Sequence, residues 1–174
     1  MISAEQIEIV EVQRHEDVTQ VADRMREFVV WLKSRYAERI WIIEKYFEQE
    51  TWERELASLR KNYAPPDGAL LLAKVDGKPV GCVLAHKIGD GVCEMKRMFV
   101  QPEFHGIGLG RALATRIIDV ARRQGYRSMR LDTGPFQTEA QGLYLALGFR
   151  KIPCYYDCPE ELKKELVFME RAPL

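Results

Sequence analysis

The sequence has little cysteine, no excess of charge of either sign and no long apolar run. Among its 174 residues, Lys plus Arg equals Asp plus Glu at 26 each. This balance gives no sign of a polyanionic partner, so we expect no binding to nucleic acid. No apolar run reaches the length of a membrane span, and residues 1–20 lack a signal-peptide core. We therefore expect no membrane association and a cytoplasmic location.

The cysteines, at positions 82, 93, 154 and 158, are too sparse for a disulfide framework. Cys154 and Cys158 have the spacing of half a zinc site, but the other half would need further Cys or His at ligand spacing. Cys82 and Cys93 lie eleven residues apart in strand-like sequence and do not supply it. We expect ordinary reduced thiols and no metal.

The rest of the composition is that of a soluble globular domain, with 47% hydrophobic and 30% charged residues. We expect one domain over residues 1–174. Apolar residues recur at steps of three and four in two regions before residue 63, then along 109–124 and 138–147, which predicts helices. Strand-like segments are 7–12, 69–75, 80–88, 92–100, 128–132, 149–152 and 166–169. Turn signals at Asp76-Gly77 and Gly89-Asp90-Gly91 make three of them an antiparallel meander. The later alternation predicts a mixed α/β fold with at least one parallel crossover.

Three glycines at alternate positions, Gly106, Gly108 and Gly110, come directly before a helical pattern. A Walker loop would need Lys-Ser/Thr next, but Arg111-Ala112 follows. A dinucleotide fingerprint would need glycine where Arg111 stands. A tight turn alone would not need three glycines, each of which costs about 0.5–1 kcal/mol relative to alanine. The remaining interpretation is a set of free amides at a helix N-terminus that hold a pyrophosphate without a metal.

Two motifs resemble the GCN5-related N-acetyltransferase (GNAT) superfamily. The stretch His105-Gly106-Ile107-Gly108-Leu109-Gly110 matches its coenzyme A loop, except that His105 stands where the family has Gln or Arg. The second motif is Ala140-Gln-Gly-Leu-Tyr144-Leu-Ala-Leu-Gly148-Phe149. The resemblance implies a GNAT-like fold, with a mostly antiparallel twisted sheet of about six to seven strands and about four helices.

The resemblance also implies an acyltransferase that moves an acetyl group from acetyl-CoA to a primary amine by direct attack in a ternary complex. Residues expected at the cofactor are Met98, Phe99, Val100, His105, Gly106, Ile107, Gly108, Leu109, Gly110 and Arg111. Two alternatives remain: a non-catalytic acyl-CoA-binding sensor, and an enzyme that uses another acyl donor such as succinyl-CoA. The last would need a cationic pocket, for which Lys96 and Arg97 are candidates.

The chemistry needs an acid for the leaving thiolate and a base for the attacking amine. By resemblance Tyr144 is the candidate acid, although its apolar neighbours would also suit a packing role. Glu94, on the strand before the loop, is the candidate base. The meander places His86 opposite Glu94 or one residue away, as a proton relay or as a cross-strand charged pair. Alternatively, Glu94 belongs to a solvated charged face with Lys96 and Arg97.

The acceptor site is the least determined part of the sequence. Tyr155 and Tyr156 are polar and turn-like, so we expect them, with His86, to contact the acceptor. Aromatic residues of the N-terminal helices would suit an amine pocket, the core or the contacts of a homodimer. Asp132-Thr133 ends a strand, where ligands gather in open α/β sheets, but Gly134-Pro135 follows and favours a simple turn.

Overall fold

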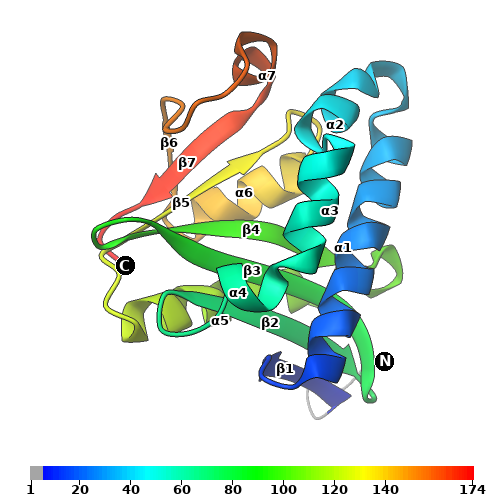
Figure 1. The fold of residues 1–174 in the computed structure, drawn as a ribbon, viewed down its shortest axis with the longest axis vertical. Helices are drawn as coiled ribbons and strands as arrows, with labels where there is room; N and C mark the ends of the chain where they lie inside the picture. The colour runs from blue at the N-terminus through cyan, green and yellow to red at the C-terminus, as the bar shows by residue number, and fades with distance from the viewer. Residues whose placement is uncertain (1–5) are drawn as a thin grey trace.

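A seven-stranded sheet runs through the computed structural model, which describes residues 6–174 (Figure 1). Its order is β1-β2-β3-β4-β5-β7-β6. All neighbours are antiparallel except β4 and β5, which α5 connects as a parallel crossover. The strands are β1 Ile7–Glu11, β2 Gly68–Val75, β3 Lys78–Gly89, β4 Val92–Val100, β5 Ser128–Thr133, β6 Arg150–Ile152 and β7 Val167–Arg171. The predicted fold class and the parallel crossover are confirmed.

The meander of β2, β3 and β4 forms where the turn residues predict it. Asp76 and Gly77 both have positive φ, at 50° and 75°, as a two-residue hairpin turn requires. In the next hairpin, His86 lies directly opposite Glu94. The meander therefore fixes the position of two of the predicted site residues.

The described residues contain seven α-helices, more than the four or so expected from the family resemblance. They are α1 His15–Arg35, α2 Trp41–Tyr46, α3 Gln49–Ala57, α4 Leu59–Asn62, α5 Leu109–Arg123, α6 Thr138–Ala146 and α7 Glu160–Glu165. The second predicted region, which ends near residue 63, forms α3 and α4, and Ser58 caps both where they meet. Helix α2 lies in the aromatic-rich stretch before it, and the Glu48 side chain caps the start of α3 by accepting from the amides of Glu50 and Thr51. Helix α7 was not predicted from the sequence, since this short helix buries only Leu162 and shows no apolar periodicity. No helix within residues 6–174 is long and apolar enough to cross a membrane.

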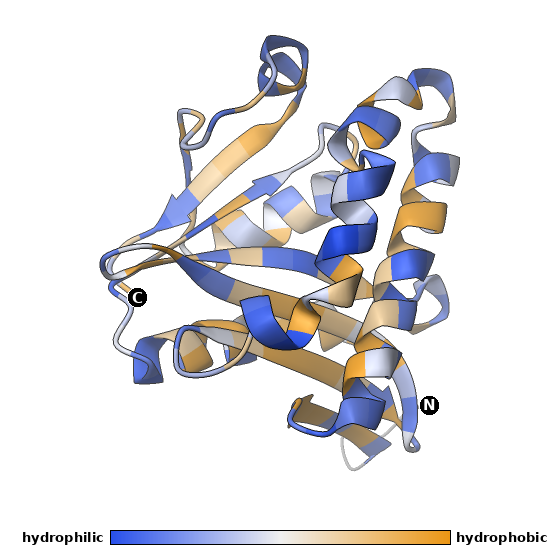
Figure 2. Cartoon of the chain, viewed as in Figure 1, coloured by the Kyte–Doolittle hydropathy of each residue, from blue (hydrophilic) through white to orange (hydrophobic). Residues whose placement is uncertain are grey.

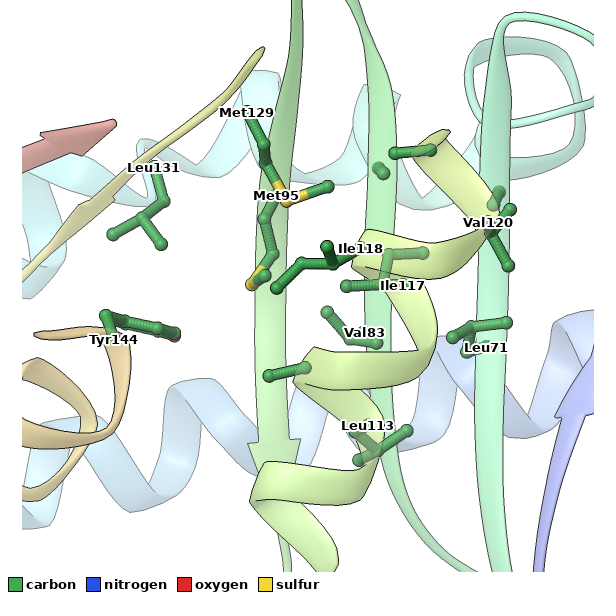
Figure 3. Close-up of a cluster of buried hydrophobic side chains, with 14 of the residues drawn as sticks. Leu71, Val83, Met95, Leu113, Ile117, Ile118, Val120, Met129, Leu131 and Tyr144 are labelled. Atoms are coloured by element: carbon green, nitrogen blue, oxygen red, sulfur yellow. The ribbon is translucent and has the colours of Figure 1, made fainter. Parts of the chain in front are cut away.

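Helices cover both faces of the sheet, because side chains alternate along its central strands. On β2, Leu70 and Leu72 face the cluster under α1, α2 and α4, while Leu71 and Ala73 face the cluster under α5. Figure 2 shows much of β2 and β7 in hydrophobic colours and much of α3 in hydrophilic ones. Figure 3 shows α5 on its face of the sheet, with Tyr144 beside the same cluster.

The sheet opens between β4 and β5, and this opening positions the candidate site. The two strands pair only from Val92 to Glu94 on β4, and Figure 1 shows them diverging beyond that point. Arg97 has a φ of 54°, and the β3–β4 register shifts between Cys82 and Leu84. This bulge changes the direction of the last residues of β4. Within the described chain, Met95–Val100 thus has no strand partner on its β5 side.

The four cysteines all carry free thiols, and Cys82 and Cys93 are fully buried. Burial raises the pKa of both buried thiols to about 12. Such thiols are poor nucleophiles at neutral pH. Over residues 6–174, no three or more His, Cys, Asp or Glu side chains are grouped so as to hold a metal.

Candidate active site

The glycine loop starts α5 with its backbone open to a cleft. Gly106 and Gly108 have positive φ, at 79° and 85°, and Gly108 is the N-cap of α5. A Cβ on either would meet no protein atom within 4 Å. Glycine therefore serves the backbone conformation and close approach to a ligand, at a helix N-terminus that favours anions.

His105 joins this loop to the end of β4. Its ring Nε2 donates to the Val100 carbonyl oxygen at 2.8 Å, and its ring meets Trp31 edge-on at 6.3 Å between centroids. The residue that departs from the family pattern thus anchors the loop through its own side chain.

We call the space beside the loop the loop cleft. It lies between α1, the end of β4, the loop and α6, and Phe28, Trp31 and Leu143 help to line it. The predicted cofactor residues that line it are Met98, Phe99, Val100, His105, Gly106, Gly108, Leu109, Gly110 and Arg111. Ile107 does not, and its side chain is exposed. The structure therefore brings the predicted cofactor residues together, apart from Ile107.

Tyr144 lines a second space, the middle cleft, which adjoins the loop cleft at Met98 and Gln137. The tyrosine is buried, and its ring packs 5.8 Å from that of Phe149. Burial and then the negative charge of Asp132 raise the pKa of its hydroxyl. Tyr144 is therefore packed in the core and also lines a cleft, and its role as an acid stays a prediction.

Glu94 lies outside the middle cleft, in a third space that we call the tyrosine cleft. Its carboxylate accepts from Tyr155 Oη at 2.6 Å and from His86 Nε2 at 2.8 Å, and Lys96 Nζ lies 3.5 Å away. Burial alone would raise the pKa of Glu94, but the His86 hydrogen bond and the Lys96 charge outweigh it and lower the pKa to about 2. Since Glu94 is only 5% exposed, the interpretation as a solvated charged face is wrong.

Asp132, at the end of β5, is held by two further tyrosines. Tyr46 donates to Oδ1 at 2.6 Å and Tyr156 donates to Oδ2 at 2.9 Å. Burial and the Asp132 charge raise the pKa of both phenols, so both stay protonated as donors. Asp132 lines the middle cleft beside Tyr144, while Tyr156 lines the tyrosine cleft.

Arg97 connects the middle and tyrosine clefts, and Tyr46 and Lys96 line both as well. Its guanidinium donates to both oxygens of Glu55, at 3.0 and 2.6 Å. It also lies 4.7 Å from the ring centroid of Phe47. Arg97 and Lys96 both have carboxylate partners, so neither is an open cation for a succinyl group.

Comparison with known proteins shows the family of the chain. The sequence model of the Acetyltransferase (GNAT) family matches residues 25–149. The chain belongs to this family. Among curated GNAT relatives, an uncharacterised N-acetyltransferase of Schizosaccharomyces pombe is 42% identical over 107 residues, which are 60% of this chain and 66% of the relative. The IAA acetyltransferase of Azospirillum brasilense is 42% identical over 87 residues, 49% of this chain and 57% of the relative. The matches thus span less than two thirds of these two relatives.

Solved GNAT structures share the fold over nearly the whole chain. A GCN5-related N-acetyltransferase from Kribbella flavida has a TM-score of 0.68 at 26% identity, covering 99% of this chain and 100% of the other. The PaiA N-acetyltransferase of Thermoplasma acidophilum, solved with coenzyme A, has a TM-score of 0.69 at 21% identity, covering 95% and 98%. The resemblance found from the motifs is confirmed at the level of family and fold.

Three features of the middle cleft were not predicted from the sequence. They are the presence of Tyr46, the ion pair that neutralises Arg97, and the hydrogen bonds that Asp132 accepts from tyrosines. The position of Asp132 at the carboxyl end of a strand was the available signal. Tyr46 lies in an aromatic-rich stretch with no periodicity to orient it. The contact of Arg97 with Glu55 crosses 42 residues, which no local pattern reveals.

Proposed function

We propose that this GNAT protein transfers an acetyl group from acetyl-CoA to a primary amine, by direct attack in a ternary complex. The observation that carries the proposal is the order of three neighbouring clefts along β4, which share lining residues and are lined in turn by the glycine loop, Tyr144 and Glu94. Pyrophosphate, thioester and amine would meet these groups in the same order.

The cofactor would bind through the backbone. The free amides at the start of α5 and the charge of Arg111 favour the pyrophosphate without a metal. The β5-facing edge of Met98–Val100 offers backbone groups to the pantetheine arm, as an added strand would use them, apart from the Val100 carbonyl, which accepts from His105. A backbone N–H of the same segment would donate to the thioester oxyanion.

In the reaction, the amine nitrogen forms a bond to the thioester carbonyl carbon, and the carbon–sulfur bond then breaks. Tyr144 would give its proton to the departing thiolate, yielding coenzyme A and a neutral amide. Its raised pKa keeps the phenol protonated before this step.

Glu94 and His86 would receive the proton that the amine loses, directly or through a water molecule. The low pKa of Glu94 keeps it ionised and also makes it a weak base. Glu94 would therefore pass the proton on to water, while His86 keeps its Nε2–H on the carboxylate and, with a side chain that is 28% exposed, would take up a proton only at Nδ1. Tyr155 holds Glu94 from the acceptor side, and Tyr156 lies beside it.

The first test is calorimetry with acetyl-CoA in the presence of a chelator. Binding is expected, and its absence overturns the proposal. The second test is a screen with labelled acetyl-CoA over amino acids, polyamines, aminoglycosides and peptides. Transfer to a primary amine supports the proposal. Binding without transfer to any acceptor would favour a non-catalytic acyl-CoA sensor instead.

A further inference from the structure

We propose that Asp132 binds the acceptor's protonated amine next to the thioester, and that the acceptor is therefore a primary alkylammonium ion that reaches the cleft with its positive charge. This inference rests on the proposed function and assigns the acceptor's polar anchor to a residue other than Glu94.

The first support is the position of Asp132. It ends β5 on the side where β4 and β5 diverge, and it lines the same cleft as Tyr144 and Met98. After burial, the negative charge of Asp132 is the second cause that raises the pKa of the Tyr144 hydroxyl. A group bound at Asp132 thus lies close to the proposed acid, whereas Glu94 lines only the outer tyrosine cleft.

The second support is the difference in charge compensation between the two carboxylates. Glu94 contacts Lys96 and His86, and Tyr155 donates to its other oxygen. Asp132 accepts from two neutral phenols, and among residues 6–174 no Lys, Arg or His forms an ion pair with it. A partly buried carboxylate without a counter-ion favours a cationic ligand.

The third support is the aromatic surround. Tyr46 and Tyr156 donate their hydroxyl groups to the two oxygens of the Asp132 carboxylate, and Tyr155 lies 5.2 Å from Tyr156 between ring centroids. Aromatic rings attract cations, most strongly where water is partly removed, and the Arg97 guanidinium already lies 5.4 Å from the centroid of the Tyr46 ring. The bound ammonium would first lose a proton toward Glu94 through water, and acetylation of the resulting amine would give a neutral amide. The attraction that holds the charged substrate would therefore not hold the product.

The test uses coenzyme A derivatives, so the acceptor need not be identified first. The sulfur carries either a 3-aminopropyl group, which ends in an ammonium, or a butyl group, which is its neutral counterpart of the same length. Calorimetry measures the affinity of both, and of coenzyme A itself. In Asp132→Asn, the preference for the amine over the butyl derivative should fall by about tenfold or more, with coenzyme A affinity unchanged.

Two variants control for the charge change. Asp90→Asn removes an exposed carboxylate in the β3–β4 turn, outside the three clefts, and should leave the preference within about twofold. Glu94→Gln tests whether Glu94, rather than Asp132, binds the ammonium group. If the preference survives Asp132→Asn, or is lost only in Glu94→Gln, the assignment to Asp132 is overturned. Failure of the unaltered protein to bind coenzyme A would instead remove the proposed function.

Asp132→Glu keeps the test decisive if Asp132→Asn fails to fold. The glutamate carries its charge one methylene farther into the cleft. The preferred probe should therefore change from the 3-aminopropyl to the shorter 2-aminoethyl derivative. An unchanged preferred length would contradict a direct contact with the ammonium.

Discussion

The loop cleft and the tyrosine cleft each share lining residues with the middle cleft, but they are built differently. The loop cleft is formed by consecutive backbone, with Gly106 and Gly108 at positive φ and no Cβ in the way. The tyrosine cleft is formed by side chains from β3, β4, α2 and the segment before α7, held by hydrogen bonds between them. Under the proposed function, the cofactor would be bound by a short local motif, while the acceptor would meet residues that only tertiary folding brings together.

The largest expected effect is on turnover, at Tyr144 in the middle cleft. Tyr144→Phe should lower kcat by about 100-fold or more, because the thiolate loses its proton donor. Acetyl-CoA affinity should stay within about twofold, since the ring keeps its packing against Phe149. Steady-state kinetics with the acceptor found by the screen, together with calorimetry, measure both. Tyr126→Phe is the matched control, a buried tyrosine bonded to the Asp67 carbonyl, and it should keep full turnover. Unchanged kcat in Tyr144→Phe would remove the acid role.

The second prediction concerns the ion pair between Glu55 and Arg97, which lines the tyrosine cleft. Arg97→Met should lower the free energy of unfolding by about 3–5 kcal/mol, because it leaves the Glu55 carboxylate buried without its partner. Denaturant unfolding measures this change. Arg122→Met, which breaks the exposed pair with Asp119, should cost less than about 1 kcal/mol. The double variant with Glu55→Gln should recover part of the loss, and no recovery would speak against the pair as the cause.

The third prediction concerns acid stability. The pKa of Glu94 is about 2 in the fold, below the ordinary value of 4.5. Ionised Glu94 therefore stabilises the fold above about pH 4.5, and this contribution is lost as the pH falls toward 2. Unfolding of Glu94→Gln should be less pH-dependent over this window, by up to about 3 kcal/mol. Glu53→Gln, at an exposed position on α3, serves as the control and should keep the original pH dependence. Identical pH dependence in Glu94→Gln and the unaltered protein would refute the shift.

The fourth prediction concerns the glycine loop, whose backbone lines the loop cleft. Gly108→Ala should weaken coenzyme A binding by about tenfold, because a methyl group enters the loop cleft and the left-handed backbone is strained. Gly77→Ala is a matched control, since Gly77 also has positive φ and open space around it but lies in a distant hairpin. Both variants should lose about 1–2 kcal/mol of stability, measured by denaturant unfolding. Equal coenzyme A affinity in the two variants would show that the loop does not bind it.

The same contrast explains what could be predicted from sequence. The meander, the crossover and the glycine loop follow from turn residues and apolar spacing, which are local. His86 and Glu94 could be paired from the sequence because a short hairpin fixes their register. The role of Tyr144 and the identity of the cofactor came from resemblance to the family, and the residue roles remain proposals.

The parts that escaped prediction depend on long-range contacts. Tyr46 and Asp132 are 86 residues apart in the sequence, and Tyr155 and Glu94 are 61 apart. Nothing in the spacing of either pair indicates that they meet. The break between α2 and α3 depends on Glu48 as a cap, and glutamate is not a usual N-cap residue.

The early separation of β4 from β5 has a consequence for self-association. Unpaired strand edges invite pairing with other chains, and proteins normally shorten, charge or cover them. Here the open edge of Met95–Val100 is an interior one, flanked by β5 and lining clefts between helices on both faces. A second sheet cannot dock there, but a narrow extended molecule can. The split thus presents the hydrogen-bonding groups of a strand edge to a ligand while shielding them from aggregation.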